Sequence, residues 1–192
     1  MSQADDLALA APPSFKLRPW AEEYRDAFAQ MHEDSLVMAD LGGPFDRAAS
    51  NEKFDRYRDA WAVHGISRWA IVDVENSFLG YVGIMRRADA DHPLGPHFEV
   101  GWRLRRAVWG MGYATEGARR ALKHAWSIPG VAEIVSYTSA ENGPSRKVME
   151  RLGLRRDPTR DFTARYPRGD WNGLVWVADR PASLSSTRVR VD

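Results

Sequence analysis

The stretch between residues 99 and 118 constrains the fold more than any other part of the chain. A β-prone run, Glu99–Leu104, is followed by Gly110-Met-Gly112 and then directly by a helical pattern. Two glycines one residue apart let the backbone turn tightly and let a ligand approach the amides closely. The free N–H groups and the positive dipole end of the new helix favour a phosphate. The segment therefore predicts a strand–turn–helix unit with an anion site, although an ordinary tight turn explains Gly-x-Gly equally well.

Hydrophobic periodicity places further strands and helices on both sides of this unit. The order β-α-α-β-β-β-α-β-α-β is that of an α/β domain. The stretch 157–173, rich in Arg and Pro, is expected to be a long loop near a cleft or an interface. The apolar runs predict strands at 15–18, 68–74, 78–85, 97–104, 133–140 and 174–179, and helices at 20–31, 47–62, 114–126 and 144–152.

The ends of the chain differ in composition from its middle. Residues 1–14 and 182–192 are expected to form a flexible leader and a flexible tail, which leaves 15–181 as a single domain. No apolar run approaches the roughly 20 residues of a membrane helix. Asp5 and Asp6 stand where a signal peptide would carry basic residues. These features predict a soluble, cytoplasmic protein without a membrane partner.

Charge is distributed unevenly along the chain. Residues 1–100 contain 17 acidic and 10 basic residues, a net charge of −7, whereas residues 101–192 contain 9 acidic and 17 basic residues, a net charge of +8. The total of +1 argues against a nucleic-acid partner. The asymmetry predicts two surfaces with opposite charge preferences, with solvated helix faces as the simpler explanation.

Several classes of site are excluded or disfavoured by the motifs that are missing. The chain has no cysteine, which excludes disulfides, a thiol nucleophile and thiolate metal sites. Its histidines lack the spacing of a metal site, so no metal is expected. There is no Gly-Lys-Ser/Thr for a P-loop, and Thr115 stands where a dinucleotide fingerprint requires a third glycine.

Three stretches together resemble the GNAT (Gcn5-related) N-acetyltransferase superfamily. They are Glu99-Val-Gly-Trp102, Trp109-Gly-Met-Gly-Tyr-Ala-Thr-Glu116 and Asn142-Gly-Pro-Ser-Arg-Lys-Val-Met-Glu-Arg-Leu-Gly153. They are most similar to the branch of bacterial ribosomal-protein N-terminal acetyltransferases. The resemblance covers roughly residues 15–180, and its specific part is 98–154. It implies a mixed, mostly antiparallel sheet flanked by helices on both faces, with splayed central strands that admit acetyl-CoA.

The resemblance also implies how acetyl-CoA is held. The backbone of Trp102, Arg103 and Leu104 would bind the pantetheine arm, and Asn142 and Ser145 would lie near the cofactor and its sulfur. Ala107 departs from the arginine or glutamine of many members, which weakens one phosphate contact. The remaining phosphate-binding positions are Arg105, Arg106, Trp109, Gly110, Met111, Gly112, Tyr113, Ala114 and Thr115.

Acetyl transfer from sulfur to an amine needs a neutral amine and a proton for the leaving thiolate. Glu99 is the candidate base, directly or through water, and its alternative is a solvent-facing carboxylate at a sheet edge. Ser145 is the candidate acid, and its alternative is a helix cap. Tyr137 on the neighbouring strand is a competing acid. The alternative for Trp109 is a purely structural role, in which its side chain fills the core beneath the loop.

The implied reaction transfers acetyl from acetyl-CoA to a primary amine, either a protein N-terminus or a small molecule such as an aminoglycoside, a polyamine or an amino-acid derivative. The alternative is a non-catalytic domain that senses acyl-CoA. In the acidic half, Asp34, Asp40 and Asp46 are expected to form a rim that attracts a cationic amine. Three tryptophans of the same half are expected in the core or in an acceptor pocket, namely Trp20, Trp61 and Trp69. The resemblance also allows a homodimer.

Overall fold

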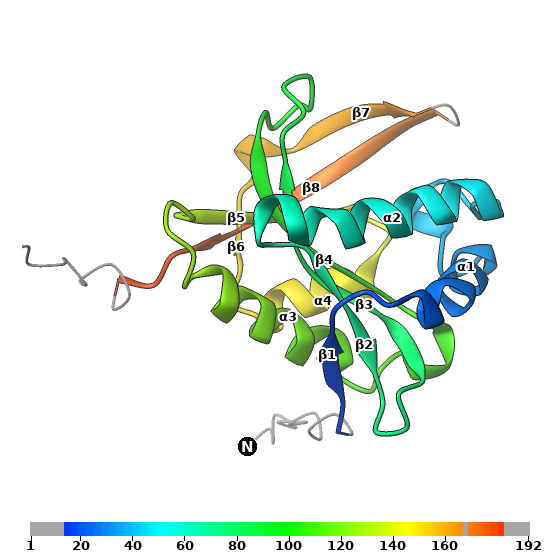
Figure 1. Cartoon of the computed structure of the whole chain (residues 1–192). Helices are drawn as coiled ribbons and strands as arrows, with labels where there is room; N and C mark the ends of the chain where they lie inside the picture. The colour runs from blue at the N-terminus through cyan, green and yellow to red at the C-terminus, as the bar shows by residue number, and fades with distance from the viewer. Residues whose placement is uncertain (1–13, 167–168, 183–192) are drawn as a thin grey trace, which may run out of the picture.

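The computed structural model describes residues 14–166 and 169–182, so the expected leader and tail lie almost entirely outside the described residues. The order of strands and helices agrees with the sequence prediction up to residue 154 (Figure 1). The helices are α1 Arg25–Glu33, α2 Arg47–His64, α3 Tyr113–Ala125 and α4 Gly143–Arg151. The strands are β1 Lys16–Arg18, β2 Arg68–Val72, β3 Phe78–Arg87, β4 His97–Leu104, β5 Glu133–Thr138, β6 Arg155–Arg156, β7 Phe162–Tyr166 and β8 Gly169–Asp179.

The strands form one mixed sheet in the order β1-β2-β3-β4-β5-β8-β6, with β7 paired to β8. Every pairing is antiparallel except that of β4 with β5. Those two strands meet in register only at Glu99 and Val135. Beyond that point β4 remains paired to β3 but no longer to β5. The predicted splay of the central strands is therefore confirmed, and it leaves one backbone edge of β4 without a partner strand.

Helices cover both faces of the sheet because β2, β3 and β4 alternate apolar side chains between two cores. On one face, α3 and α4 pack against side chains such as Val82 and Val100. On the other, α1 and α2 pack against side chains such as Tyr81 through the fully buried Phe28 and Phe54. Burying one such phenylalanine contributes about 1.5–3 kcal/mol. Within the described residues, no helix is long and apolar enough to cross a bilayer.

Helix α2 has clear start and stop signals. The Asp46 carboxylate accepts a hydrogen bond from the Ala49 amide at 2.8 Å, and Gly65 ends the helix with a φ of 62°. Lys53 and Tyr57 lie one turn apart and are both buried, so they occupy the face that covers the sheet. The helix thus carries an ionisable side chain toward β2, β3 and β4.

The expectation of a long loop at 157–173 is wrong. Strand β7 and the first half of β8 form a hairpin there, with Phe162 opposite Gly173 (Figure 1). The Phe162 ring packs edge-on against the Tyr137 ring, with 5.3 Å between the ring centroids. The ring centroids of Trp171 and Phe162 are 5.7 Å apart. These aromatic contacts stabilise a hairpin in a stretch whose sequence is mostly polar, which explains why its composition predicted a loop.

Candidate active site

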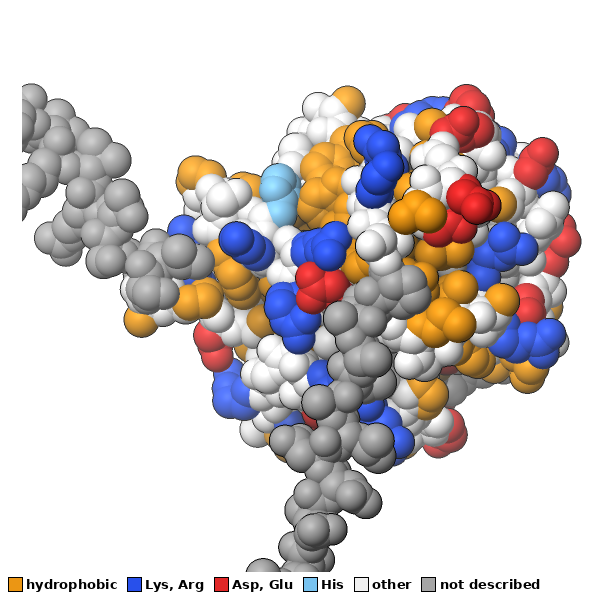
Figure 2. All heavy atoms as spheres, turned by 90° about the horizontal axis from the view of Figure 1, so that it is seen from below, with side chains coloured by type: hydrophobic (Ala, Val, Ile, Leu, Met, Phe, Trp, Pro, Cys, Tyr) orange, Lys and Arg blue, Asp and Glu red, His pale blue; other side chains and the backbone are white. Residues whose placement is uncertain are grey.

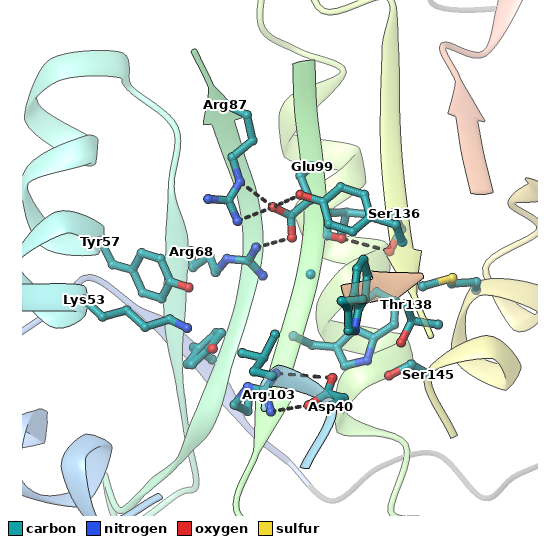
Figure 3. Close-up of a pocket in the computed structure, with 18 residues that line it drawn as sticks. Asp40, Lys53, Tyr57, Arg68, Arg87, Glu99, Arg103, Ser136, Thr138 and Ser145 are labelled. Atoms are coloured by element: carbon teal, nitrogen blue, oxygen red, sulfur yellow. Dashed lines mark hydrogen bonds and ion pairs between the residues drawn. The ribbon is translucent and has the colours of Figure 1, made fainter. Parts of the chain in front are cut away.

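A pocket of about 140 Å³ lies where β4 and β5 diverge (Figure 3). Its wall includes side chains from β2, β3, β4, β5, α2 and α4, together with Trp171 of β8. Predicted site residues found in this wall are Glu99, Trp102, Arg103, Tyr137 and Ser145. Side chains that the sequence did not single out for the site include Lys53, Tyr57, Arg68, Tyr81, Arg87, Met149 and Trp171.

Glu99 is buried and paired on both carboxylate oxygens. Arg68 donates from Nη2 to one oxygen at 2.7 Å, and Arg87 donates from Nε to the other at 2.6 Å. The Tyr137 hydroxyl also donates to this carboxylate at 3.1 Å. Burial alone would raise the pKa of Glu99, but the attraction of Arg87 and Arg68 outweighs it and holds the pKa well below 4.5.

These contacts correct one alternative for Glu99 and define its chemistry. It is not a solvent-facing edge carboxylate, because it is only 8% exposed and lies on a central strand. A carboxylate with a lowered pKa stays ionised at neutral pH and binds protons weakly. Burial and the negative charge of Glu99 raise the pKa of Tyr137, which keeps that phenol protonated.

Glycines in the neighbouring strands let Arg68 reach Glu99. The register places Arg68, Gly83 and Gly101 side by side on β2, β3 and β4. A Cβ added at Gly101 would lie 2.2 Å from Nη1 of Arg68, so the guanidinium occupies the space above that glycine. The Trp20 and Trp61 indoles donate to the Arg68 carbonyl at 2.7 and 3.0 Å. The arginine is therefore held at its backbone and at its side chain.

We expect Gly101→Ala to displace Arg68 and to lower the free energy of unfolding by about 1–3 kcal/mol, the usual cost of overpacking a core. Chemical denaturation followed by fluorescence measures this. Gly143→Ala is the matched control, because an added Cβ there has no atom within 4 Å. Equal stability of the two variants would show that the space above Gly101 is not required.

The tryptophans expected in an acceptor pocket lie elsewhere. Trp20 is buried among Phe28, Phe54 and Tyr57, which bears out the core alternative for it. Trp61 and Trp69 contact each other with ring centroids 4.6 Å apart, and neither is in the pocket wall. Their position follows from strand register and helix packing, which spacing along the sequence does not reveal.

Of the three aspartates expected to form an acidic rim, only Asp40 lines the pocket. Asp40 forms an ion pair with Arg103 at 2.9 Å, and its carboxylate accepts a hydrogen bond from the side-chain Nδ2 of Asn142 at 3.1 Å. Asp34 accepts from the Leu36 amide at 2.9 Å, and Asp46 caps α2. Each carboxylate therefore already has an internal partner. Arg103, predicted to contact the cofactor through its backbone, and Asn142, also predicted beside the cofactor, both bind Asp40 through their side chains.

Ser145 stands at the first turn of α4 and lines the pocket. The helix is capped by Asn142, whose side-chain oxygen accepts from the Ser145 amide at 3.2 Å. The hydroxyl of Ser145 is therefore not the capping group, which removes the alternative that the sequence left open for it. Figure 3 shows the side chain on the α4 side of the pocket, across from Arg103 and Asp40.

The glycine loop follows the unpaired edge of β4. Gly110 and Gly112 have φ values of 77° and 84°, which side-chain-bearing residues rarely adopt, and an added Cβ at Gly110 would meet no atom within 4 Å. Among the described residues, no side chain caps the start of α3. Trp109 is 45% exposed and donates to the Leu104 carbonyl at 2.9 Å, so it is not a core plug. These features fit an anionic group.

Basic side chains flank this loop. Arg105 and Arg106 are exposed, and the nearest carboxylate to Arg106 in an ion pair is Asp34 at 3.7 Å. Exposed hydrophobic side chains include Met111 of the loop. Figure 2 shows basic and hydrophobic side chains intermingled over the face seen from below. The remaining predicted positions, Tyr113, Ala114 and Thr115, form the first turn of α3.

Comparison with known proteins gives a consistent picture. The protein-family model described as acetyltransferase (GNAT) domain matches residues 15–155 of this chain. The FsC-acetyl coenzyme A-N(2)-transacetylase of Aspergillus fumigatus is 29% identical over 145 residues, which are 72% of this chain. The match covers 61% of that relative, so the chain spans less than two thirds of its length.

Solved structures show the same fold. An acetyltransferase from Agrobacterium tumefaciens is 28% identical, with a TM-score of 0.71 over 88% of this chain and 92% of that one. The ribosomal-protein-S5-alanine acetyltransferase from Vibrio fischeri is 14% identical, with a TM-score of 0.68 over 88% of this chain and 94% of that one. The predicted fold class, including helices on both faces of the sheet, is confirmed.

Proposed function

Because this chain belongs to the GNAT acetyltransferase family, we propose that it transfers the acetyl group from acetyl-CoA to a primary amine. The observation that carries the proposal is the divergence of β4 and β5 after Glu99. The divergence opens a pocket with ionisable and hydroxyl side chains at the end of a strand that leads into a glycine loop. A thioester carrier and an amine can meet there from opposite sides of the sheet.

The residues around the opening and the glycine loop fit acetyl-CoA as the carrier of the acetyl group. The unpaired edge of Trp102–Leu104 offers backbone groups to an amide-containing arm, and the loop Trp109–Thr115 offers amides and a helix dipole to phosphates. Arg105 and Arg106 add positive charge. When bound, acetyl-CoA supplies the activated acetyl group as a thioester.

The chemistry forms a nitrogen–carbon bond and breaks the carbon–sulfur bond, while the amine loses a proton and the sulfur gains one. Arg68 and Arg87 line the pocket with positive charge, which lowers the pKa of an amine placed there and favours its neutral form. Glu99 fixes the arginines and Tyr137 in place. Its role as a general base stays a prediction.

The acceptor is proposed to be a protein N-terminal or small-molecule amine. The fungal relative is named for acetyl coenzyme A and an N(2) position, and the Vibrio fischeri protein for an alanine of a ribosomal protein. The ion-paired, hydroxyl-containing pocket favours transfer over the alternative of a sensor that only binds acyl-CoA.

Thiol release from acetyl-CoA in the presence of an amine panel tests the function. The panel contains peptides with free N-termini, amino acids, diamines and aminoglycosides. We expect one class to release thiol in step with formation of its acetylated product. Saturable acetyl-CoA binding with no product from any member would instead support the sensor.

We expect Ser145→Ala to lower kcat by about 100-fold, because a positioned proton donor contributes about 10²–10⁴-fold. Tyr137→Phe should lower kcat less, since that hydroxyl already donates to Glu99 and its pKa is raised. Steady-state thiol release compares the two variants at saturating acetyl-CoA. A larger loss in Tyr137→Phe would make Tyr137 the donor.

A further inference from the structure

The pocket carries an excess of positive charge. Four basic side chains line it, and only two carboxylates, Asp40 and Glu99, oppose them. Arg103 pairs with Asp40, while Arg68 and Arg87 share the single carboxylate of Glu99. The fourth basic side chain is Lys53. This surplus does not favour the polycationic amines that the sequence allowed as acceptors.

Lys53 is the least compensated of the four. It is 8% exposed, and among the described residues no carboxylate forms an ion pair with its ammonium. Its ammonium lies 5.1 Å from the ring centroid of Phe45 and about 6 Å from those of Tyr57 and Tyr81. Figure 3 shows it extending from α2 toward the strands that carry Arg68 and Arg103. Aromatic rings compensate a buried ammonium only in part.

We propose that Lys53 binds a carboxylate of the acceptor, so that the substrate is an amine that also carries a carboxylate, as an amino acid does. This inference rests on the proposed acetyl transfer and names its acceptor class. The carboxylate completes the charge balance of Lys53, and the shared arginine pair adds further attraction. A diamine or polyamine meets repulsion from the same four side chains.

A carboxylate can also come from the acyl donor. The two sources are separated by comparing acetyl-CoA with succinyl-CoA, whose acyl group ends in a carboxylate. Lys53 comes from α2, which covers the face of β4 that bears Glu99 and Gly101, whereas the glycine loop leads into α3 on the opposite face. The carrier is proposed at that loop, so the position of Lys53 favours the acceptor as the source.

The experiment uses matched pairs of acceptors with the full-length protein. Phenylalanine is compared with phenethylamine, lysine with cadaverine, and γ-aminobutyrate with butylamine, in each case with thiol release from acetyl-CoA as the readout. We expect the carboxylated member to have the higher kcat/KM in at least one pair, by about 10- to 100-fold, the range of one charge-assisted hydrogen bond.

Lys53→Met removes the charge and keeps most of the side chain, and Lys53→Arg restores a cation. We expect Lys53→Met to raise the KM of the carboxylated acceptor by at least about tenfold and to reduce the preference within the pair to about one. Lys53→Arg should recover part of the preference. Lys123→Met is the control, because Lys123 is exposed on α3.

A second readout does not need turnover. Chemical-shift or calorimetric titration with N-acetylphenylalanine and with its carboxamide reports carboxylate binding directly. We expect the wild type to bind the acid in preference to the amide, and Lys53→Met to lose that preference. Equal binding of acid and amide by the wild type would overturn the inference, even if acetyl transfer were absent.

The other outcomes are equally decisive. Acetyl transfer with no preference within any pair overturns the inference and leaves the proposed function in place. An equal fall of kcat for both members in Lys53→Met places the ammonium at the reacting atoms and also overturns it. A preference for succinyl-CoA that disappears in Lys53→Met assigns the carboxylate to the donor, against the inference. Failure of acetyl-CoA to bind overturns the proposed function itself.

Discussion

Glu99→Gln is expected to lower the free energy of unfolding by about 3–5 kcal/mol, because it leaves Arg68 and Arg87 without the carboxylate that they share. The Arg68 side chain is only 4% exposed, so water cannot replace the lost partner. For a domain of this length the loss corresponds to a fall in Tm of roughly 10 °C. Differential scanning calorimetry measures it.

The matched control is Glu116→Gln. Glu116 also pairs with two arginines, Arg119 and Arg120, but on the exposed surface of α3. Surface pairs of this kind contribute less than about 1 kcal/mol, so the control should lose no more than a few degrees. Equal melting temperatures for the two variants would contradict the account of Glu99.

The pH dependence of stability gives a second readout of the same contact. The pKa of Glu99 is held below 4.5 by the attraction of Arg87 and Arg68, which exceeds the opposing effect of burial. A group with a lowered pKa stabilises the fold above its unfolded pKa, and the stabilisation is lost as the pH falls toward the folded pKa. Below about pH 4.5 the wild type should therefore lose stability toward that of Glu99→Gln, and a constant gap would contradict this.

Glu99→Gln also tests the general-base hypothesis. A variant that binds acetyl-CoA normally but loses most turnover would support it, whereas full activity would reject it. The lowered pKa favours a positioning role for Glu99, in which turnover falls because Arg68 and Arg87 lose their arrangement. An acidic limb of the pH–rate profile that is unchanged in the variant would support that role, because protonation of a general base lowers the rate at low pH.

Gly112→Val is expected to abolish acetyl-CoA binding, which means a loss of more than about 100-fold in affinity, or about 2.7 kcal/mol. The φ of 84° is strained for a β-branched residue, and the side chain would stand where the amides at the start of α3 face the ligand. Calorimetric titration with acetyl-CoA measures the loss.

Gly130→Val controls for backbone strain. Gly130 has a φ of 82°, and it lies beyond the C-terminal end of α3, away from the loop. Both variants carry the same strain of about 1–2 kcal/mol, so they should unfold at similar temperatures. Retained affinity in Gly112→Val, or equal loss in both, would show that the phosphate cradle is misplaced.

Local patterns predicted most of the fold. The Gly110-Met-Gly112 turn and the apolar runs of β2, β3 and β4 are short-range features, and the structure has them at the expected residues. The β7–β8 hairpin was missed because it is stabilised by contacts of Phe162 and Trp171 with Tyr137, which lies far from them in the sequence. Such contacts leave no periodic signal in a polar stretch.

The site was predictable only where a motif marks it. Glu99, Tyr137 and Ser145 do line one pocket with Trp102 and Arg103. The basic side chains that determine its charge come from α2, β2 and β3, and only the register that aligns Arg68 with Gly83 and Gly101 brings them there. The signal available in the sequence was Arg68, an arginine at the start of the apolar run of β2. The sequence did not reveal that its partner is Glu99.

We propose that an acetyl group is transferred to an amine at the opening between β4 and β5. The most direct measurement incubates the protein with acetyl-CoA that carries a deuterated acetyl group and with the amine panel, and follows the label by mass spectrometry. We expect the label to appear on the nitrogen of one acceptor class, with an equal amount of free thiol. Label that remains on coenzyme A, despite saturable binding and with every acceptor class present, would contradict it.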